Sequence, residues 1–122
     1  MQVTDPTLPL TEDHRELLDQ LPDKWSLRVL DQLCEHGAMR FNELRRAIPA
    51  ISQKSLTATL RRLERNGMVN RVVVSTRPMA VEYRIAPVGH GLQDLIDALF
   101  RWTTLHLPDV ERARARFDNV AE

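Results

Sequence analysis

The sequence contains little cysteine, few aromatic residues and no long apolar run. Cys34 is the one cysteine among 122 residues, so neither an intrachain disulfide nor a metal site built from several cysteines is possible. Aromatic residues make up 5% of the chain, and no apolar run approaches the roughly 20 residues of a membrane span. The first ten residues contain Asp5, Pro6 and Pro9 and lack the apolar segment of a secretory signal. These features predict a cytoplasmic protein without membrane association.

Motifs for catalysis and metal binding are also missing. No Ser/His/Asp constellation, Walker sequence or Gly-rich phosphate loop is present. The histidines are His14, His36, His90 and His106. None are paired at i, i+4 spacing, so scattered surface positions are a better interpretation than a metal site. We therefore expect no enzymatic activity, no metal and no cofactor.

The chain has no net charge, but its charges are unevenly distributed. Residues 38–77 carry nine basic and two acidic residues, a net charge of +7, whereas residues 1–37 carry −5 and residues 78–122 carry −2. A basic segment in an otherwise acidic chain is typical of a phosphate-binding surface. Phe41 is the one aromatic residue in this segment and is predicted to point inward. Because single-strand binding needs exposed aromatic platforms, duplex DNA is the favoured partner.

Residues 52–69 have the pattern of a short amphipathic helix. Leu56, Leu60 and Leu63 recur at helical spacing on one side. The opposite face is formed by Lys54, Ala58, Arg61 and Arg65, flanked by Thr57 and Arg62. Ser52 is the expected N-cap, and Asn66-Gly67 is a typical helix end. Taken alone, this segment also fits a solvated surface helix.

Further helices and strands are predicted on both sides of this segment. The other expected helices are 11–21, 24–36, 43–48 and 87–106, the first three with Thr11, Asp23 and Asn42 as N-caps and the last ended by Pro108. Residues 38–41 suggest a short extended piece. Residues 69–75 and 80–85 suggest two strands joined at Arg77. We expect residues 1–10 to be a flexible arm, residues 11–106 to form one domain, and residues 107–122 to be a tail that is either helical or frayed.

The order of these elements predicts the fold. Two short helices joined by a tight turn at Pro49-Ala50-Ile51, the second presenting cations, form a helix-turn-helix. The hairpin that follows is a wing. We therefore predict a mainly α fold with a small β-hairpin wing, which is a winged helix-turn-helix with additional N- and C-terminal helices for dimerisation.

Several motifs together resemble those of one family of bacterial transcription regulators. They are Asp23-Lys24-Trp25, Arg40-Phe41-Asn42-Glu43-Leu44-Arg45, Ile48 to Thr57, Leu63 to Val69, and Val81-Glu82-Tyr83 with Gly89. In this order, over about residues 21–106, they resemble the HxlR family (DUF24). The resemblance implies a homodimer that binds pseudo-palindromic operator DNA, commonly as a repressor of nearby genes.

The chain departs from this family at three places. Many members carry a sensing cysteine ahead of the Lys-Trp pair, and this chain has none there. Asp23 stands where the family usually has Gly, and Ala86-Pro87 where a Ser or Thr cap is common. Cys34 follows Leu30 by one helical turn, so packing in the core is favoured over a role as a redox sensor.

These arguments give a set of expected site residues. The predicted DNA contacts are Arg40, Ser52, Gln53, Lys54, Ser55, Thr57, Arg61, Arg62 and Arg77. Residues of the leading turn should reach bases in the major groove, the helix arginines should contact phosphates, and Arg77 should approach the minor groove. The predicted dimer contacts are Leu17, Leu18, Leu95, Leu99 and Trp102. Any inducer is expected to be an apolar molecule near Trp25 and Trp102. The alternative function is a winged-helix module that binds protein rather than DNA.

Overall fold

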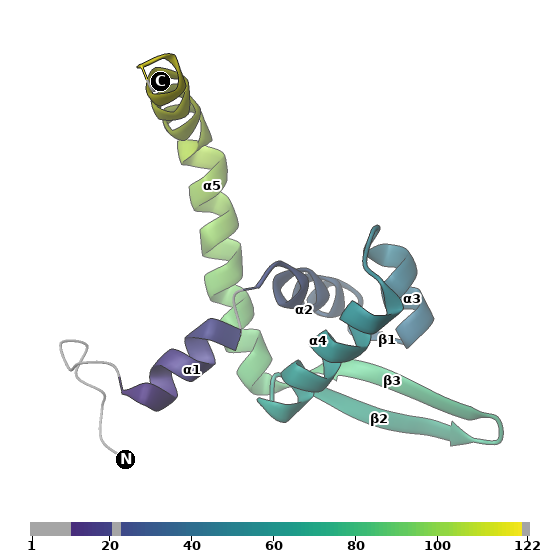
Figure 1. Ribbon diagram of the computed structural model, residues 1–122. Coiled ribbons are helices and arrows are strands. Elements are labelled where there is room, and N and C mark those ends of the chain that lie inside the picture. Colours follow the sequence, from purple (N-terminus) through teal and green to yellow (C-terminus); the bar gives the residue numbers. More distant parts are fainter. Residues whose placement is uncertain (1–10, 21–22, 121–122) are drawn as a thin grey trace.

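The chain folds as a mainly helical winged helix-turn-helix with a long C-terminal helix (Figure 1). The computed structural model describes residues 11–20 and 23–120. Their elements are α1 (Glu12–Gln20), α2 (Lys24–His36), β1 (Ala38–Met39), α3 (Phe41–Ala47), α4 (Gln53–Arg65), β2 (Val69–Thr76), β3 (Met79–Ile85) and α5 (Pro87–Val120). The predicted fold class is confirmed, while the expected arm at residues 1–10 lies outside the described residues.

The core lies where α2, α3 and α4 meet the sheet and the first turns of α5. Its buried apolar residues are Val29, Leu30, Leu33, Met39, Leu44, Ile48, Ile51, Leu56, Leu60, Leu63, Met68, Val69 and Ile96. The predicted stripe of α4 is confirmed, because Leu56, Leu60 and Leu63 are at most 2% exposed. Burying each such side chain contributes about 1.5–3 kcal/mol. These contacts fix which face of α4 is turned outward.

Both long helices of the winged domain begin as the sequence predicts. The Asp23 carboxylate accepts hydrogen bonds from the N–H groups of Trp25 and Ser26, at 2.9 and 3.1 Å. The Ser52 hydroxyl accepts one from the Ser55 N–H at 3.0 Å. These bonds satisfy amides that have no partner inside the helix. The predicted end of α4 is also confirmed, since Gly67 takes φ +75°, which Gly adopts at little cost.

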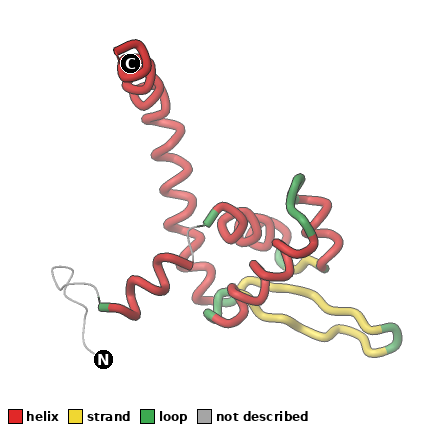
Figure 2. The backbone as a smooth tube through the Cα atoms, viewed as in Figure 1, coloured by secondary structure: helices red, strands yellow, loops and turns green. Residues whose placement is uncertain are grey.

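The wing is a three-stranded antiparallel sheet in the order β1-β3-β2. The sequence predicted a two-stranded hairpin. The third strand is the short extended piece, which pairs Ala38 with Arg84 and Met39 with Tyr83. Figure 2 shows the hairpin projecting away from the helices, with its turn at the far end. The wing tip is therefore displaced from the core while its base is fixed to it.

Two predicted helix boundaries are wrong. α3 begins at Phe41 rather than after Asn42, because the Glu43 carboxylate accepts a hydrogen bond from the Arg40 N–H at 2.8 Å and supports an earlier start. α5 does not end before Pro108 but continues to Val120. Proline removes one helical hydrogen bond. The alternating Arg and Ala residues that follow it are strong helix formers, so the helix resumes.

The prediction that Cys34 packs in the core is also wrong, since its side chain is exposed. The buried face of α2 is formed by Ser26, Val29, Leu30 and Leu33. Each helical residue advances by about 100°, which places Cys34 roughly 90° from the centre of that face. The spacing of one turn from Leu30 therefore did not suffice to bury it.

Candidate nucleic-acid interface

The turn between α3 and α4 sets the direction of the second helix. Ile48 and Ile51, at either side of the turn, are 2% and 6% exposed and anchor it to the core. Between them, Ala50 has φ +70°, a left-handed conformation that non-glycine residues rarely adopt. The turn is thus tight, and the first residues of α4, Gln53 and Lys54, are exposed.

The outer face of α4 carries polar and basic side chains. Its exposed residues are Gln53, Lys54, Thr57, Ala58, Arg61, Glu64 and Arg65. Five of these, Gln53, Lys54, Thr57, Ala58 and Arg61, line one shallow hollow on the surface. The small Ala58 in the middle leaves room for a convex partner between the flanking polar groups. The structure therefore brings together four of the expected contact residues.

The two serines near the start of α4 are placed differently. Ser52 is exposed, but its hydroxyl is engaged with the Ser55 N–H. Ser55 is half-buried and lies about 200° around the helix from Thr57. Both serines lie at the leading end of the helix, yet only Ser52 belongs to the same exposed surface as Gln53. Ser52 has a capping role in addition to any role at the interface.

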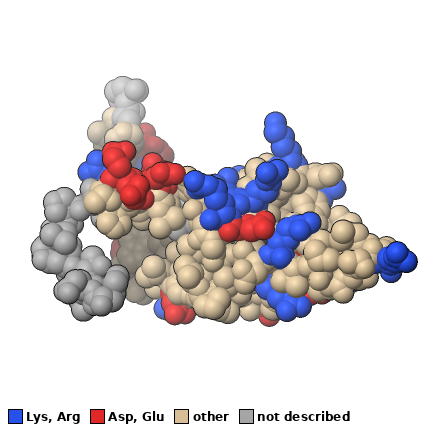
Figure 3. Space-filling model, turned by 90° about the horizontal axis from the view of Figure 1, so that it is seen from below, with Lys and Arg blue, Asp and Glu red and all other residues tan. Residues whose placement is uncertain are grey.

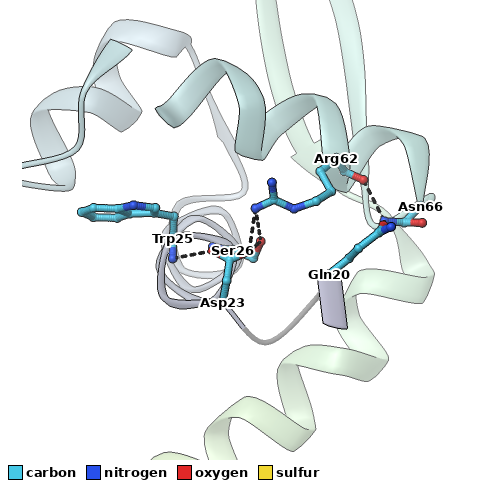
Figure 4. Close-up of polar contacts among 6 residues, drawn as sticks. All are labelled: Gln20, Asp23, Trp25, Ser26, Arg62 and Asn66. Carbon is cyan, nitrogen blue, oxygen red and sulfur yellow. Dashed lines mark hydrogen bonds and ion pairs between the residues drawn. The ribbon is translucent and has the colours of Figure 1, made fainter. Parts of the chain in front are cut away.

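Arg62 is not part of the exposed face of α4. Its Nη2 donates to Asp23 Oδ2 at 2.6 Å and to the Ser26 hydroxyl at 3.4 Å, both in the first turn of α2 (Figure 4). The Arg62 and Asp23 side chains are 30% and 35% exposed. Partial burial alone would raise the pKa of the Asp23 carboxyl, but the bonds from Ser26 and the charge of Arg62 lower this pKa below its ordinary value.

A second group of cations lies between α3 and the wing. Arg40 and Arg46 line a groove together with Glu43 of α3 and residues 79–82 of β3, which include Glu82. Arg77 is exposed in the turn between β2 and β3. The structure therefore places Arg40 beside the wing strand and Arg77 at the outer end of the wing.

Within residues 11–20 and 23–120, most of these cations form no ion pair. Among the residues that the structure describes, ion pairs with aspartate or glutamate engage Arg62, Arg84 and Arg112 but none of the cations on the outer face of α4. Figure 3 shows Lys and Arg side chains in several groups on one face, with one group at the narrow end of the molecule. Such groups attract a polyanion to the part of the face on which they lie.

The expected DNA contacts leave out two basic residues of this surface. Arg65 lines a hollow with Arg61 and the partly exposed Arg62, opposite Glu16 and Gln20 of α1. Arg46 lies in the groove beside Arg40. Helical spacing had already placed Arg65 on the outer face of α4, four residues after Arg61, but the expected DNA contacts did not include it. No sequence signal pointed to Arg46, because its position depends on how the wing packs beside α3.

The predicted dimer contacts are all exposed in the single chain. Leu95, Leu99 and Trp102 of α5 are 68%, 47% and 53% exposed, and Leu17 and Leu18 of α1 are 39% and 53% exposed. The buried side of α5 is a different one, formed by Gly89, Gln93 and Ile96. The ring of Trp102 packs on His106, at 5.0 Å between centroids. Trp25 instead lies beneath Lys24 and Arg28, so the two tryptophans have different neighbours.

No helix within the described ranges combines the length and the apolar character that crossing a bilayer requires. In the same part of the chain, His, Cys, Asp and Glu side chains do not gather in groups of three or more that could hold a metal ion.

Known proteins share both the sequence and the fold. The model of the HxlR-like helix-turn-helix family matches residues 20–111. An uncharacterized HTH-type transcriptional regulator, YtfH of Escherichia coli, is 37% identical over 100 residues, which cover 82% of this chain and 79% of YtfH. YtcD of Bacillus subtilis, described in the same words, is 39% identical over 90 residues, covering 74% of this chain and 71% of YtcD.

Solved structures agree with this assignment. The putative transcriptional regulator ytfH from Salmonella typhimurium has a TM-score of 0.72 at 37% identity, covering 83% of this chain and 89% of that one. The redox regulator HypR in its reduced form has a TM-score of 0.73 at 32% identity, covering 83% and 99%. The family match spans the helix-turn-helix, the wing and the first part of α5. The chain therefore belongs to the HxlR-like helix-turn-helix family of transcriptional regulators, a family of DNA-binding proteins and not of enzymes.

Proposed function

We propose that this chain binds double-stranded DNA sequence-specifically as a homodimer, on a pseudo-palindromic operator, and represses nearby genes. The observation that carries the proposal is the exposed face of α4, where Gln53, Lys54, Thr57 and Arg61 line one hollow. Side chains at the leading end of a recognition helix reach base edges, and basic side chains farther along bind phosphates. The repressor role and the operator symmetry rest on the family resemblance.

Within this proposal, the wing supplies contacts outside the major groove. Arg77 at the wing tip approaches the minor groove, where the negative potential attracts arginine. Arg40 and Arg46, in the groove between α3 and β3, bind the phosphate backbone that passes beside the wing. The α4 face and the wing then contact neighbouring grooves of one duplex.

The homodimer is supported by the apolar side of α5 that the core does not use. Leu95, Leu99 and Trp102 lie on this side and are half to two-thirds exposed. In the proposed dimer they pack against their symmetry mates, together with Leu17 and Leu18 of α1. An apolar inducer near Trp25 and Trp102 remains a prediction from the sequence.

The experiment compares two single variants on a duplex selected by the protein from a random-sequence pool and on a scrambled duplex of equal length. Arg61→Ala should weaken binding to both duplexes and flatten the salt slope by about 0.9, the loss of one phosphate contact. Gln53→Ala should mainly reduce the preference for the selected duplex. If Arg61→Ala changes only the preference and leaves the salt slope untouched, the roles are wrongly assigned.

A further inference from the structure

Arg62 differs from its neighbour Arg61 in the direction of its side chain. Arg61 lines the outer hollow of α4. The Arg62 guanidinium turns toward α2, where Nη2 contacts Asp23 and Ser26, and its Nε is buried without a hydrogen-bond partner in the described part of the chain. One nitrogen of this guanidinium, Nη2, is therefore occupied by the protein itself, while the side chain stays 30% exposed beside α1.

The partner of Arg62 is held rigidly. The Asp23 carboxylate accepts hydrogen bonds from the N–H groups of Trp25 and Ser26 and from the Ser26 hydroxyl, the last at 2.9 Å. Ser26 is fully buried. Because this carboxylate is hydrogen-bonded to the first turn of α2, the contact of Arg62 with it connects α4 to α2.

A second polar tether lies one turn farther along α4. The Asn66 Nδ2 donates to Gln20 Oε1 of α1 and to the Arg62 carbonyl, both at 3.0 Å (Figure 4). The remaining buried residues of α4 are its apolar stripe and Thr59. The packing of these residues fixes which face of α4 is turned outward, and the hydrogen bonds of Arg62 and Asn66 add contacts of defined geometry toward the end of the helix.

We propose that Arg62 is a positioning residue: with Asp23 and Ser26 it fixes the rotation of α4 on α2, and through this it sets how accurately the outer face of α4 reads a DNA sequence. This inference rests on the proposed function and replaces the predicted phosphate contact of Arg62. A rotated α4 would still present Lys54 and Arg61 to phosphates. It would misplace Gln53 and Thr57, whose base contacts require accurate geometry.

The two roles of Arg62 predict opposite effects at Asp23. If Arg62 binds phosphate, Asp23 is a negative charge near the DNA, and its removal should tighten binding to every duplex. If Arg62 is a positioning residue, removal of Asp23 should weaken binding to the selected duplex only. Asp23→Ser is the suitable variant, because serine still caps α2 but cannot form the ion pair.

The experiment measures the affinities of wild type, Arg62→Ala, Asp23→Ser and the double variant for the selected and the scrambled duplex across a salt series. Arg61→Ala is the matched control. We expect Arg62→Ala and Asp23→Ser each to lower the ratio of the two affinities by about tenfold, the size of one lost base contact. The salt slope should stay at the wild-type value in both, whereas Arg61→Ala should flatten it by about 0.9. The double variant should lose little more than either single one.

Two results would overturn the inference. One is a flatter salt slope for Arg62→Ala combined with tighter binding of both duplexes by Asp23→Ser. The other is an unchanged affinity ratio in either variant. Urea unfolding without DNA confirms that each variant is folded, and Arg62→Met replaces Arg62→Ala if that variant is not, since methionine keeps an apolar stem but cannot donate to Asp23. If the wild-type protein binds no duplex, the proposed function is wrong, and this inference is wrong with it. If the wild-type protein binds the selected duplex but the variants behave otherwise than expected, only the role of Arg62 is wrong.

Discussion

The carboxylate of Asp23 and the guanidinium of Arg62 lie 2.6 Å apart and join the start of α2 to the third turn of α4. Both side chains are about one-third exposed, so solvent screening limits the pair to about 0.5 kcal/mol of stability. The role that we propose for it is geometric, because it links α2 in the core to α4, the helix that carries the proposed DNA contacts.

This pair predicts a pH dependence of stability. The pKa of Asp23 is lower in the folded chain than its ordinary value of 3.8, so the ionised carboxylate stabilises the fold above about pH 4, and this stabilisation is lost as the pH falls through the folded pKa. We expect Asp23→Asn, which keeps the helix cap, to be less stable than wild type at pH 6, and we expect this difference to be smaller at pH 3. Urea unfolding at fixed protein concentration measures both values. An identical difference at the two pH values would contradict the assignment.

Gly89 and Gly91 provide a matched pair in the first turns of α5. A Cβ at Gly89 would collide with the Met68 carbonyl oxygen and lie 2.8 Å from Ile85 Cγ1, whereas a Cβ at Gly91 meets nothing within 4 Å. Gly89→Ala should therefore destabilise the fold by about 1–3 kcal/mol. Gly91→Ala should stabilise it by about 0.5–1 kcal/mol, because alanine is the better helix former. Urea unfolding midpoints test both, and equal effects at the two positions would refute the close approach of α5 to Met68.

Cys34 should be unimportant for packing, since it is exposed on α2. We expect Cys34→Ser to change the free energy of unfolding by less than about 0.5 kcal/mol, as at other surface positions. Its neighbour Leu33 is fully buried, and Leu33→Ala should cost about 2–5 kcal/mol. Chemical denaturation of the two variants tests the contrast. A loss of several kcal/mol in Cys34→Ser would show that this side chain is covered in the assembled protein.

The proposed dimer predicts that a charge on one side of α5 separates the subunits. Leu99→Asp should give monomers at micromolar concentration in analytical ultracentrifugation, because an aspartate there would be buried without a partner. Thr104→Asp is the control, since Thr104 is exposed and lies about 140° around the helix from Leu99. Two results would exclude the Leu99 side of α5 as the dimer interface. One is a wild-type chain that sediments as a monomer, and the other is a Thr104→Asp variant that dissociates as Leu99→Asp does.

Much of the fold could be predicted because local signals and packing agree. The spacing of Leu56, Leu60 and Leu63 and the caps Asp23 and Ser52 act over a few residues, and each was placed correctly. The short extended piece at residues 38–41 was predicted, but its pairing with β3 was not, because β1 is only two residues long and carries no sequence signal for its partner. The end of α5 was misplaced because the helix-forming residues after Pro108 outweigh a single missing hydrogen bond.

The sequence predicted the candidate site less well than it predicted the fold. Helical spacing correctly placed Lys54 and Arg61 on the outer face. It could not show that Arg62, only one residue farther along, turns inward, because the Asp23 carboxylate that holds it lies 39 residues away in the chain. Contacts between distant segments decide which cations are free for a partner, and these contacts leave no local pattern.

The most direct test of the central claim is the affinity of the wild-type protein for a duplex selected from a random-sequence pool, compared with a scrambled duplex at physiological salt. We predict that the selected duplex binds at least about 1,000-fold more tightly, as specific regulators do, and that both affinities fall steeply as salt rises. Equal affinities for the two duplexes, or binding that does not change with salt, would contradict the proposal that α4 reads DNA sequence.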